Sequence, residues 1–159
     1  MADEWKAGIQ SLLNQSRVCF LATQGEGGPE TSMAPCAIHQ GNILLHLSKL
    51  ARHTANIETD PAIGLMICTP ETVADSPLAL PRVSLQGEAS PVPDGQLEAA
   101  KAAYLSAIPD AEPLFSFADF RLFQFTPSHI HWVGGFGSAR KIAVSDWRTL
   151  FAGNEGNLP

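Results

Sequence analysis

Residues 43–67 read ILLHLSKLARHTANIETDPAIGLMI, and this stretch predicts a strand, a helix and a second strand in close succession. Residues 42–47 form a short apolar run, as is typical of a buried strand, and residues 62–68 form a second such run after Pro61. Between them, residues 48–60 take helical spacing, and the proline ends the helix. The apolar residues of this helix share one face: Leu50, Ala51, Thr54 and Ile57.

Outside this stretch, short apolar segments separated by turn residues predict further strands. Gly87 predicts a bulge or a close backbone approach within residues 82–92, and Pro127 divides residues 119–132 into two strands or a bent edge strand. Six or seven strands without sustained strand–helix alternation predict a barrel or a sandwich and argue against a parallel dinucleotide-binding sheet. The other expected strands are residues 17–23, 30–39 and 141–144, and the other expected helices are residues 3–15, 94–108 (with Asp94 as N-cap) and 146–151.

The composition predicts one globular domain over residues 1–159, with its core at about 17–144. Hydrophobic residues make up 45% of the chain and charged residues 16%, a balance that leaves apolar surface to cover and favours an oligomer. The net charge of -6 argues against general nucleic-acid binding, because phosphate contacts need a basic face.

Cysteine usage and the N-terminus predict a cytoplasmic protein. Cys19, Cys36 and Cys68 lie far apart in apolar stretches without a CxxC pair, so we expect buried reduced thiols and no zinc site. The opening residues MADEWKAGIQ lack a basic segment followed by an apolar core, so no signal peptide is expected. The longest apolar runs have the length of strands, and no membrane association is expected.

The sharpest chemical feature is the SKLARH run at residues 48–53, where a strand ends and a helix begins. Ser48 is a candidate N-cap, and Lys49, Arg52 and His53 lie at i, i+3 and i+4 on one helix face. Free amides at a helix N-terminus and neighbouring cations together favour phosphate binding. The alternative is a basic, solvated helix face that binds no ligand.

Several other residues allow two interpretations each. Arg82, at the start of a strand, is either a surface residue or a contact to a ligand carbonyl or phosphate. His39 and His46, in or near strands, are either packed imidazoles or ligand contacts. His129 and His131 lie two apart on one side of a strand and can bind a metal or haem iron, although no third ligand is obvious and no metal site is predicted.

The glycine-rich residues 134–137 follow Trp132 and form either a tight turn or a loop on which Phe136 covers an aromatic ring. Arg140 and Lys141 come next and are placed to meet an anion. The sequence shows no Ser-His-Asp order, nucleophile elbow, P-loop or paired carboxylates. Catalytic residues therefore stay unassigned, and a bound cofactor is expected to carry any chemistry.

Five stretches together carry a resemblance to a known family: RVCFLAT, PETSMAPCAI, ILLHLSKLARHTANIETDPAIGLMI, LALPRVSLQGEASPVP and FRLFQFTPSHIHWVGGFGSARKI. The chain resembles the pyridoxamine 5'-phosphate oxidase-like FMN-binding split barrels, and among them the haem-utilisation branch called HugZ-like. The resemblance spans nearly all of residues 17–142. It implies a mainly β (α+β) fold, an antiparallel split β-barrel of six to seven strands with peripheral helices, which works as a homodimer with FMN between the subunits.

The resemblance also implies which residues hold the cofactor. The strand with Ser32 and Met33 and the following strand, which ends at Ser48, line the flavin and its ribityl chain. The SKLARH run holds the phosphate, and the loop at residues 134–140 reaches the flavin from the partner subunit. Members that oxidise vitamin B6 commonly have a lysine where His53 stands. The implied cofactor-binding residues are Ser32, Met33, His46, Leu47, Ser48, Lys49, Arg52, His53, Arg82, Trp132, Gly135, Phe136 and Arg140.

Departures from the family pattern narrow the expected activity. The strand with Ser32 carries no arginine, and the arginine-rich substrate motif is missing, so vitamin B6 oxidation is not expected. We therefore predict an FMN-dependent oxidoreductase with an unknown small-molecule substrate. Two alternatives stay open: a haem-binding or haem-degrading HugZ-like protein, for which haem is ligand or substrate, and a non-catalytic flavin carrier. No histidine follows His131, although many HugZ-like chains carry one in a C-terminal tail.

Overall fold

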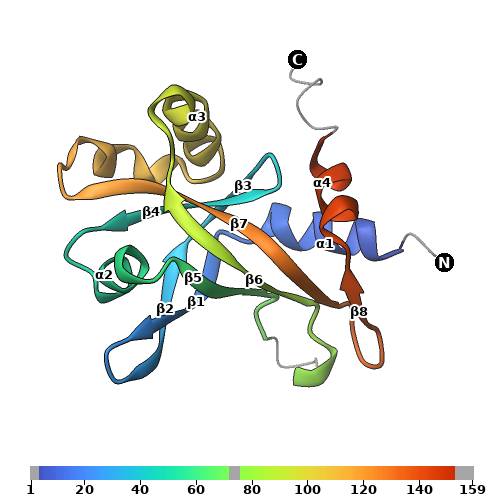
Figure 1. Ribbon diagram of the computed structural model, residues 1–159. Helices are drawn as coiled ribbons and strands as arrows, with labels where there is room; N and C mark the ends of the chain where they lie inside the picture. The colour runs from blue at the N-terminus through green and yellow to red at the C-terminus, as the bar shows by residue number, and fades with distance from the viewer. Residues whose placement is uncertain (1–3, 72–75, 153–159) are drawn as a thin grey trace, which may run out of the picture.

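A computed structural model describes residues 4–71 and 76–152 of the chain. Its centre is one antiparallel eight-stranded sheet, curled around a hydrophobic core, with helices at its periphery (Figure 1). The strands follow the order β2-β1-β5-β6-β7-β4-β3, and β8 pairs with β7 beside this path. The strands are β1 (Val18–Gly25), β2 (Gly28–Pro35), β3 (Ala37–His39), β4 (Asn42–Ser48), β5 (Ala62–Cys68), β6 (Arg82–Pro91), β7 (Phe120–Val133) and β8 (Ala139–Ile142).

The helices cover the margins of this sheet. Two α-helices lie near the chain ends, α2 covers one end of the barrel, and α3 lies against β3 and β4 (Figure 1). Their bounds are α1 (Glu4–Gln15), α2 (Arg52–Thr59), α3 (Leu97–Ala107) and α4 (Val144–Ala152), with 3-10 turns η1 (Pro77–Ala79), η2 (Asp94–Gln96) and η3 (Pro109–Ser116). The predicted split-barrel fold is confirmed, with eight strands in place of the six to seven expected. The start of the first predicted helix at Asp3 lies outside the described residues.

Two hydrophobic clusters follow from the alternation of side chains along the strands. The main cluster fills the inside of the curled sheet and includes Leu21, Leu45 and Trp147. A smaller cluster lies on the opposite side of β4, between that strand and α3, and includes Leu44 and Tyr104. As a result, β4 is buried on both of its sides, whereas β1 alternates between buried and exposed residues.

A bulge in β7 decides which of its side chains face outward. Phe123 and Phe125 belong to the main core, but beyond the bulge Ile130 and Trp132 take that place, so the inward positions change from odd to even numbers. Gly87 of β6 allows the bulge, because a Cβ there would lie 2.1 Å from the carbonyl oxygen of Thr126. The predicted bulge at Gly87 is therefore confirmed.

Of the two outcomes predicted at Pro127, the division into two strands is wrong. The structure has one 14-residue strand, β7, in which Pro127 pairs with Gly87 of β6 beside the bulge, whereas on its other side neither β4 nor β8 reaches it. The irregular register at the bulge accommodates a residue without an N–H donor, which a regular ladder would not. Conversely, the single strand expected at residues 30–39 is divided at Cys36, because β2 pairs with β1 whereas β3 pairs with β4.

Two helices begin later than their sequence signals predict. The helix expected from Ser48 begins as α2 at Arg52, with Ala51 at the N-cap position. The Ser48 hydroxyl instead accepts a hydrogen bond from the Leu50 N–H at 3.1 Å, which favours a turn before the helix. The helix expected from Asp94 opens with the 3-10 turn η2, and α3 follows without a side-chain cap.

The three cysteines are free, with Cys19 and Cys36 buried and Cys68 partly exposed. Among the described residues, no helix combines the length and apolar character needed to cross a membrane.

Candidate functional site

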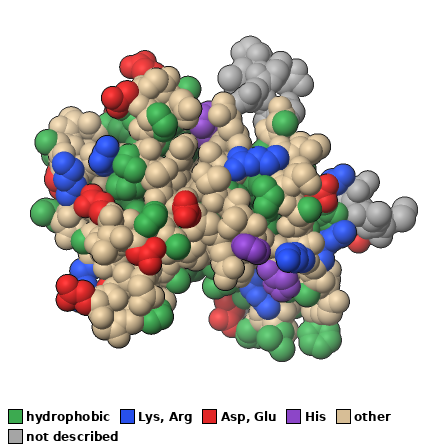
Figure 2. Space-filling view, viewed as in Figure 1, with side chains coloured by type: hydrophobic (Ala, Val, Ile, Leu, Met, Phe, Trp, Pro, Cys, Tyr) green, Lys and Arg blue, Asp and Glu red, His purple; other side chains and the backbone are tan. Residues whose placement is uncertain are grey.

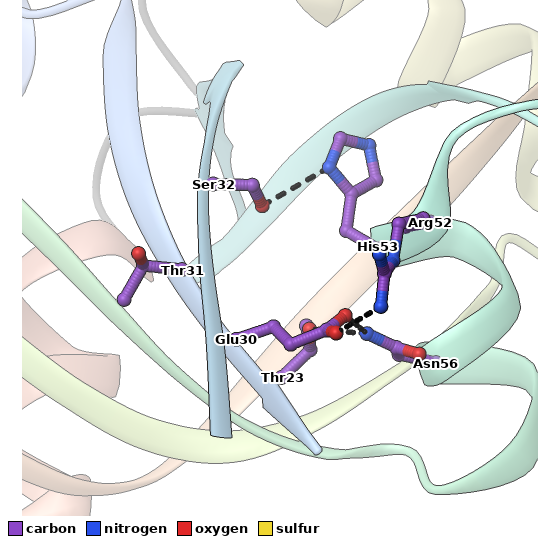
Figure 3. Close-up of a pocket in the computed structure, with 7 residues that line it drawn as sticks. All are labelled: Thr23, Glu30, Thr31, Ser32, Arg52, His53 and Asn56. Atoms are coloured by element: carbon purple, nitrogen blue, oxygen red, sulfur yellow. Dashed lines mark hydrogen bonds and ion pairs between the residues drawn. The ribbon is translucent and has the colours of Figure 1, made fainter. Parts of the chain in front are cut away.

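A cavity of about 340 Å³ lies between β2 and α2, and we call it the α2 pocket (Figure 3). The hairpin of β1 and β2 supplies one wall, and the first two turns of α2 supply the other. Three of the residues implied by the family resemblance line this pocket, namely Ser32, Arg52 and His53. The complete lining is Thr23, Glu30, Thr31, Ser32, Arg52, His53 and Asn56.

Glu30 organises the polar side chains of the α2 pocket. Its carboxylate forms an ion pair with Arg52 and accepts a hydrogen bond from the Asn56 amide at 2.7 Å (Figure 3). The same Asn56 amide also donates to the Thr23 hydroxyl at 3.0 Å. Because Glu30 neutralises Arg52 locally, the pocket offers an anion less positive charge than the sequence motif predicts.

His53 is held in the same pocket by Ser32, whose hydroxyl lies 3.0 Å from the imidazole Nδ1. Burial lowers the pKa of His53 below its usual value, because desolvation disfavours the imidazolium. The side chain is therefore neutral near pH 7. Glu30, Asn56 and Thr23 carry no sequence signal for this site, because β1, β2 and α2 meet only after folding.

The other residues of the SKLARH run serve the turn before α2. The Ser48 hydroxyl donates to Asp119 at 3.2 Å, and the Ser48 carbonyl accepts a hydrogen bond from the Thr54 hydroxyl at 2.6 Å. Lys49 is exposed, and its backbone N–H donates to the Asp119 carbonyl at 2.7 Å. These contacts tie the end of β4 to the start of β7 and leave Ser48 and Lys49 outside the lining of the α2 pocket.

His46 and Leu47 lie on opposite sides of β4. Leu47 is part of the main core, whereas His46 faces α3 and stacks on Phe115, with ring centroids 3.9 Å apart. Burial, and then the nearby Lys101 charge, lower the pKa of His46 to about 4. The buried Nδ1 of His46 has no hydrogen-bond partner among the described residues. The structure therefore places both residues in packed surroundings, and their ligand roles stay predictions.

Ser32 and Met33 also point in opposite directions, because neighbouring residues of a strand alternate between its sides. Met33 lies on the outside of the sheet with 56% of its surface exposed. In the strand registers, Met33 pairs with an exposed residue of the next strand, which in turn pairs with one of the strand after it, so that a row of exposed residues crosses the sheet. This outer row runs across the sheet as Met33, Phe20, Met66, Ser84, His131 and Lys141.

A second cavity, of about 220 Å³, opens at the β7–β8 end of the outer row. Figure 2 shows histidine and basic side chains close together over this end of the sheet. A hollow of about 620 Å³ adjoins the cavity, since both are lined by Gln86 and His129. The smaller cavity is lined by Ser84, Gln86, His129, Ile130, His131 and Lys141.

The remaining predicted residues do not line the α2 pocket. The Arg82 guanidinium donates to the Leu80 carbonyl at 2.9 Å, so it supports the preceding loop. Trp132 is buried in the main core, and Arg140 lies over the Trp5 ring at 5.3 Å.

Residues 134–137 form a tight turn, in which the Gly134 N–H donates to the Ser138 carbonyl at 2.8 Å. Gly135 has a φ of 152°, which favours glycine, and Phe136 is 80% exposed. No group of three or more metal-ligating side chains occurs within residues 4–71 and 76–152.

Comparisons with known proteins agree with this fold. The model of the CREG β-barrel family matches residues 22–149. The chain is 30% identical to the haem oxygenase HutZ of Vibrio cholerae over 144 residues, which cover 87% of this chain and 81% of HutZ.

Two solved structures extend the comparison. A heme-binding protein from Mycobacterium smegmatis superposes with a TM-score of 0.82 at 29% identity, over 94% of this chain. The chain spans 60% of the length of that protein. A pyridoxamine 5'-phosphate oxidase-like structure from Listeria innocua, 16% identical, superposes with a TM-score of 0.64 over 83% of this chain and 100% of its own, which shows a shared fold.

The family model covers most of the chain, and the similarity to HutZ extends along 87% of it. The chain therefore belongs to the CREG β-barrel family together with HutZ, and it shares its fold with the pyridoxamine 5'-phosphate oxidase-like structure.

Proposed function

We propose that this protein binds haem. The observation that carries the proposal is the similarity to a haem oxygenase along 87% of the chain, together with the similarity to a heme-binding protein along 94%. Both relatives support the haem alternative of the sequence analysis better than the flavin oxidoreductase. Haem is then the ligand, and it is also the substrate if the protein shares the activity for which HutZ is named.

The outer row supports this proposal chemically. A porphyrin ring needs apolar surface, its propionates need a cation, and its iron binds imidazole. The outer row supplies an apolar side chain in Met66, an imidazole in His131 and an ammonium group in Lys141. The α2 pocket is a poorer match, because its cation Arg52 is paired with Glu30 and its imidazole is bonded to Ser32.

Absorption spectroscopy tests haem binding directly. Hemin titrated into the purified full chain should give a Soret band that differs from that of free hemin and saturates at a defined stoichiometry. Iron-free protoporphyrin serves as the control for apolar adsorption, because it lacks the metal that imidazole ligates. A spectrum that remains the sum of free hemin and protein would overturn the proposal.

FMN is a second candidate ligand, favoured by the hydroxyl, imidazole and guanidinium groups that converge in the α2 pocket. If FMN binds there, Arg52→Ala should weaken FMN by roughly tenfold, the lower end for a charge-assisted hydrogen bond, since the side chain of Arg52 is 84% exposed. Riboflavin should bind both proteins equally, because it has no phosphate. Reduction of bound FMN by NAD(P)H would then distinguish an oxidoreductase from a flavin carrier.

The homodimer predicted from the sequence is also a proposal. Val18, Phe20 and Met33 are 44%, 47% and 56% exposed on neighbouring strands β1 and β2, an apolar surface that a second copy of the chain would cover. Light scattering at micromolar concentration should give about twice the chain mass of 17.0 kDa. A monomer that still binds its ligand with full affinity would exclude a site shared between subunits.

A further inference from the structure

His131 lies exposed in the outer row of the sheet. It lies on β7 just beyond the bulge, between Ser84 of β6 and Lys141 of β8 in the strand registers. Its side chain is exposed and lines the cavity of about 220 Å³. Within the part of the chain that the structure describes, no side chain or backbone group hydrogen-bonds its imidazole.

The neighbours of His131 match the other parts of a haem molecule. Lys141 is exposed directly beside it, and among the described residues no acidic group forms an ion pair with this lysine. In the other direction, Ser84 offers a small side chain and Met66, 36% exposed, offers an apolar one. Met66 and Ser84 would contact the ring of a bound haem, and Lys141 would offer a cation to a propionate.

The other histidines are less available. The imidazole of His46 is stacked on the Phe115 ring, and the imidazole of His53 is hydrogen-bonded to the Ser32 hydroxyl within the α2 pocket. His39 is half-buried on β3, outside the linings of both cavities.

His129 shares the outer side of β7 with His131 and lines the same cavity. Its Nδ1, however, lies 3.2 Å from the Ser128 hydroxyl, so one of its two nitrogens already has a partner. His129 also stands outside the outer row, opposite Gln86 rather than Ser84. It is therefore a matched control on the same strand and the same side.

We propose that the imidazole of His131 ligates the iron of bound haem, with Lys141 holding a propionate. This inference rests on the proposed function and assigns a ligand within it. The neutral imidazole donates a nitrogen lone pair to the iron, and no bond within haem or protein breaks in this step. The apolar surface of Met66 and the small Ser84 leave room for the ring on the outer side of the sheet.

The test compares ferric haem spectra of the full chain with those of His131→Ala and His129→Ala. His131→Ala should shift the Soret and visible bands and lower haem affinity by about tenfold or more, because about 1.4 kcal/mol of lost binding free energy already gives that factor. His129→Ala should keep the positions of the parent Soret and visible bands, because its imidazole is not the proposed iron ligand. Both side chains are exposed, so urea midpoints should confirm that both variants fold like the parent.

A rescue experiment separates iron ligation from a structural role. His131→Gly should recover the parent haem spectrum when free imidazole is added, whereas the equivalent His129→Gly variant should not respond. Lys141→Ala should weaken iron-free protoporphyrin as well as hemin, since a propionate contact does not require iron.

The outcomes keep the two proposals apart. A parent that binds haem and a His131→Ala variant with an unchanged spectrum would overturn the ligand assignment while leaving haem binding intact. A shift of the Soret and visible bands in His129→Ala instead of His131→Ala would also overturn the ligand assignment. A parent chain that does not bind haem would overturn the proposed function, and this inference with it.

Discussion

The outer side of the sheet has two parts with opposite surroundings. Over β3 and β4, the helix α3 and the turn η3 cover it (Figure 1). His46 lies stacked on Phe115 beneath this cover. Over β5 to β8 the corresponding side carries exposed residues of the outer row, including His131. Strand β7 connects the two parts, because its Leu122 pairs with His46 and its own His131 follows beyond the bulge.

The difference shows that whether other segments pack over a histidine, rather than the residue type, decides whether its imidazole is accessible to a ligand. Burial lowers the pKa of His46 to about 4, and its imidazole packs among the aromatic rings of α3, η3 and β7. The imidazole of His131 is exposed beside a cation and an apolar side chain. The covered histidine therefore contributes to packing, and the uncovered one is the candidate ligand.

The largest expected effect comes from removing the bulge that divides the two parts. Gly87→Ala places a Cβ 2.1 Å from the Thr126 carbonyl oxygen, which the backbone must move to avoid. We expect a loss of on the order of 3 kcal/mol or more in the free energy of unfolding, measured by urea denaturation. The expected disturbance extends to His131, whose outward direction depends on this register.

Gly64→Ala is the matched control on the neighbouring strand β5. A Cβ at Gly64 meets its nearest atom, the Cβ of Ala22, at 3.5 Å, an ordinary contact. The change in unfolding free energy should stay below about 1 kcal/mol. If both alanine variants lost the same stability, the close approach at Gly87 would not be the cause.

A second prediction uses pH to test the burial of the covered histidine, His46. Because the folded pKa of His46 is about 4 and its usual value is 6.5, the unfolded chain binds a proton before the folded chain does as the pH falls. Stability present above pH 6.5 is therefore lost progressively down to about pH 4, by roughly 3 kcal/mol at about 1.4 kcal/mol per pH unit.

His46→Leu should remove this contribution, so its unfolding free energy should fall less steeply than that of the parent between pH 6.5 and 4. Urea titrations at several pH values measure both slopes. A His46→Leu variant with the parent slope would assign the acid sensitivity to another group.

The smallest expected effect concerns the α2 pocket, which lies on the opposite side of β2 from the outer row. Glu30→Gln removes the charge that neutralises Arg52 and keeps an amide oxygen to accept the hydrogen bond of Asn56. If FMN binds in this pocket, its affinity should rise by about three- to tenfold, equivalent to roughly 0.7–1.4 kcal/mol.

Fluorescence titration of FMN and riboflavin measures this change, and riboflavin should bind the parent and the variant alike. Equal gains for both ligands would mean that Glu30 affects the flavin ring or the pocket shape rather than the phosphate. No gain for FMN would argue that the guanidinium of Arg52 does not face a bound phosphate.

Local patterns in the sequence were enough to predict most elements of this fold. The short apolar run at residues 62–68 predicted β5 with its observed bounds, and Gly87 predicted a bulge or a close backbone approach. Hydrophobic periodicity acts between near neighbours in the chain, so a single sequence contains it. The order of these elements also carried the resemblance that the family match confirms.

Tertiary structure alone decided which polar groups are already engaged. Arg52 and Glu30 are 22 residues apart, and Ser48 and Asp119 are 71 apart, so the partners that occupy them have no local signal. The same holds for the histidines of β4 and β7, because α3 covers His46 and leaves His131 open. Whether a charge or an imidazole is free depends on which distant segment packs against it, and only the folded chain specifies that contact.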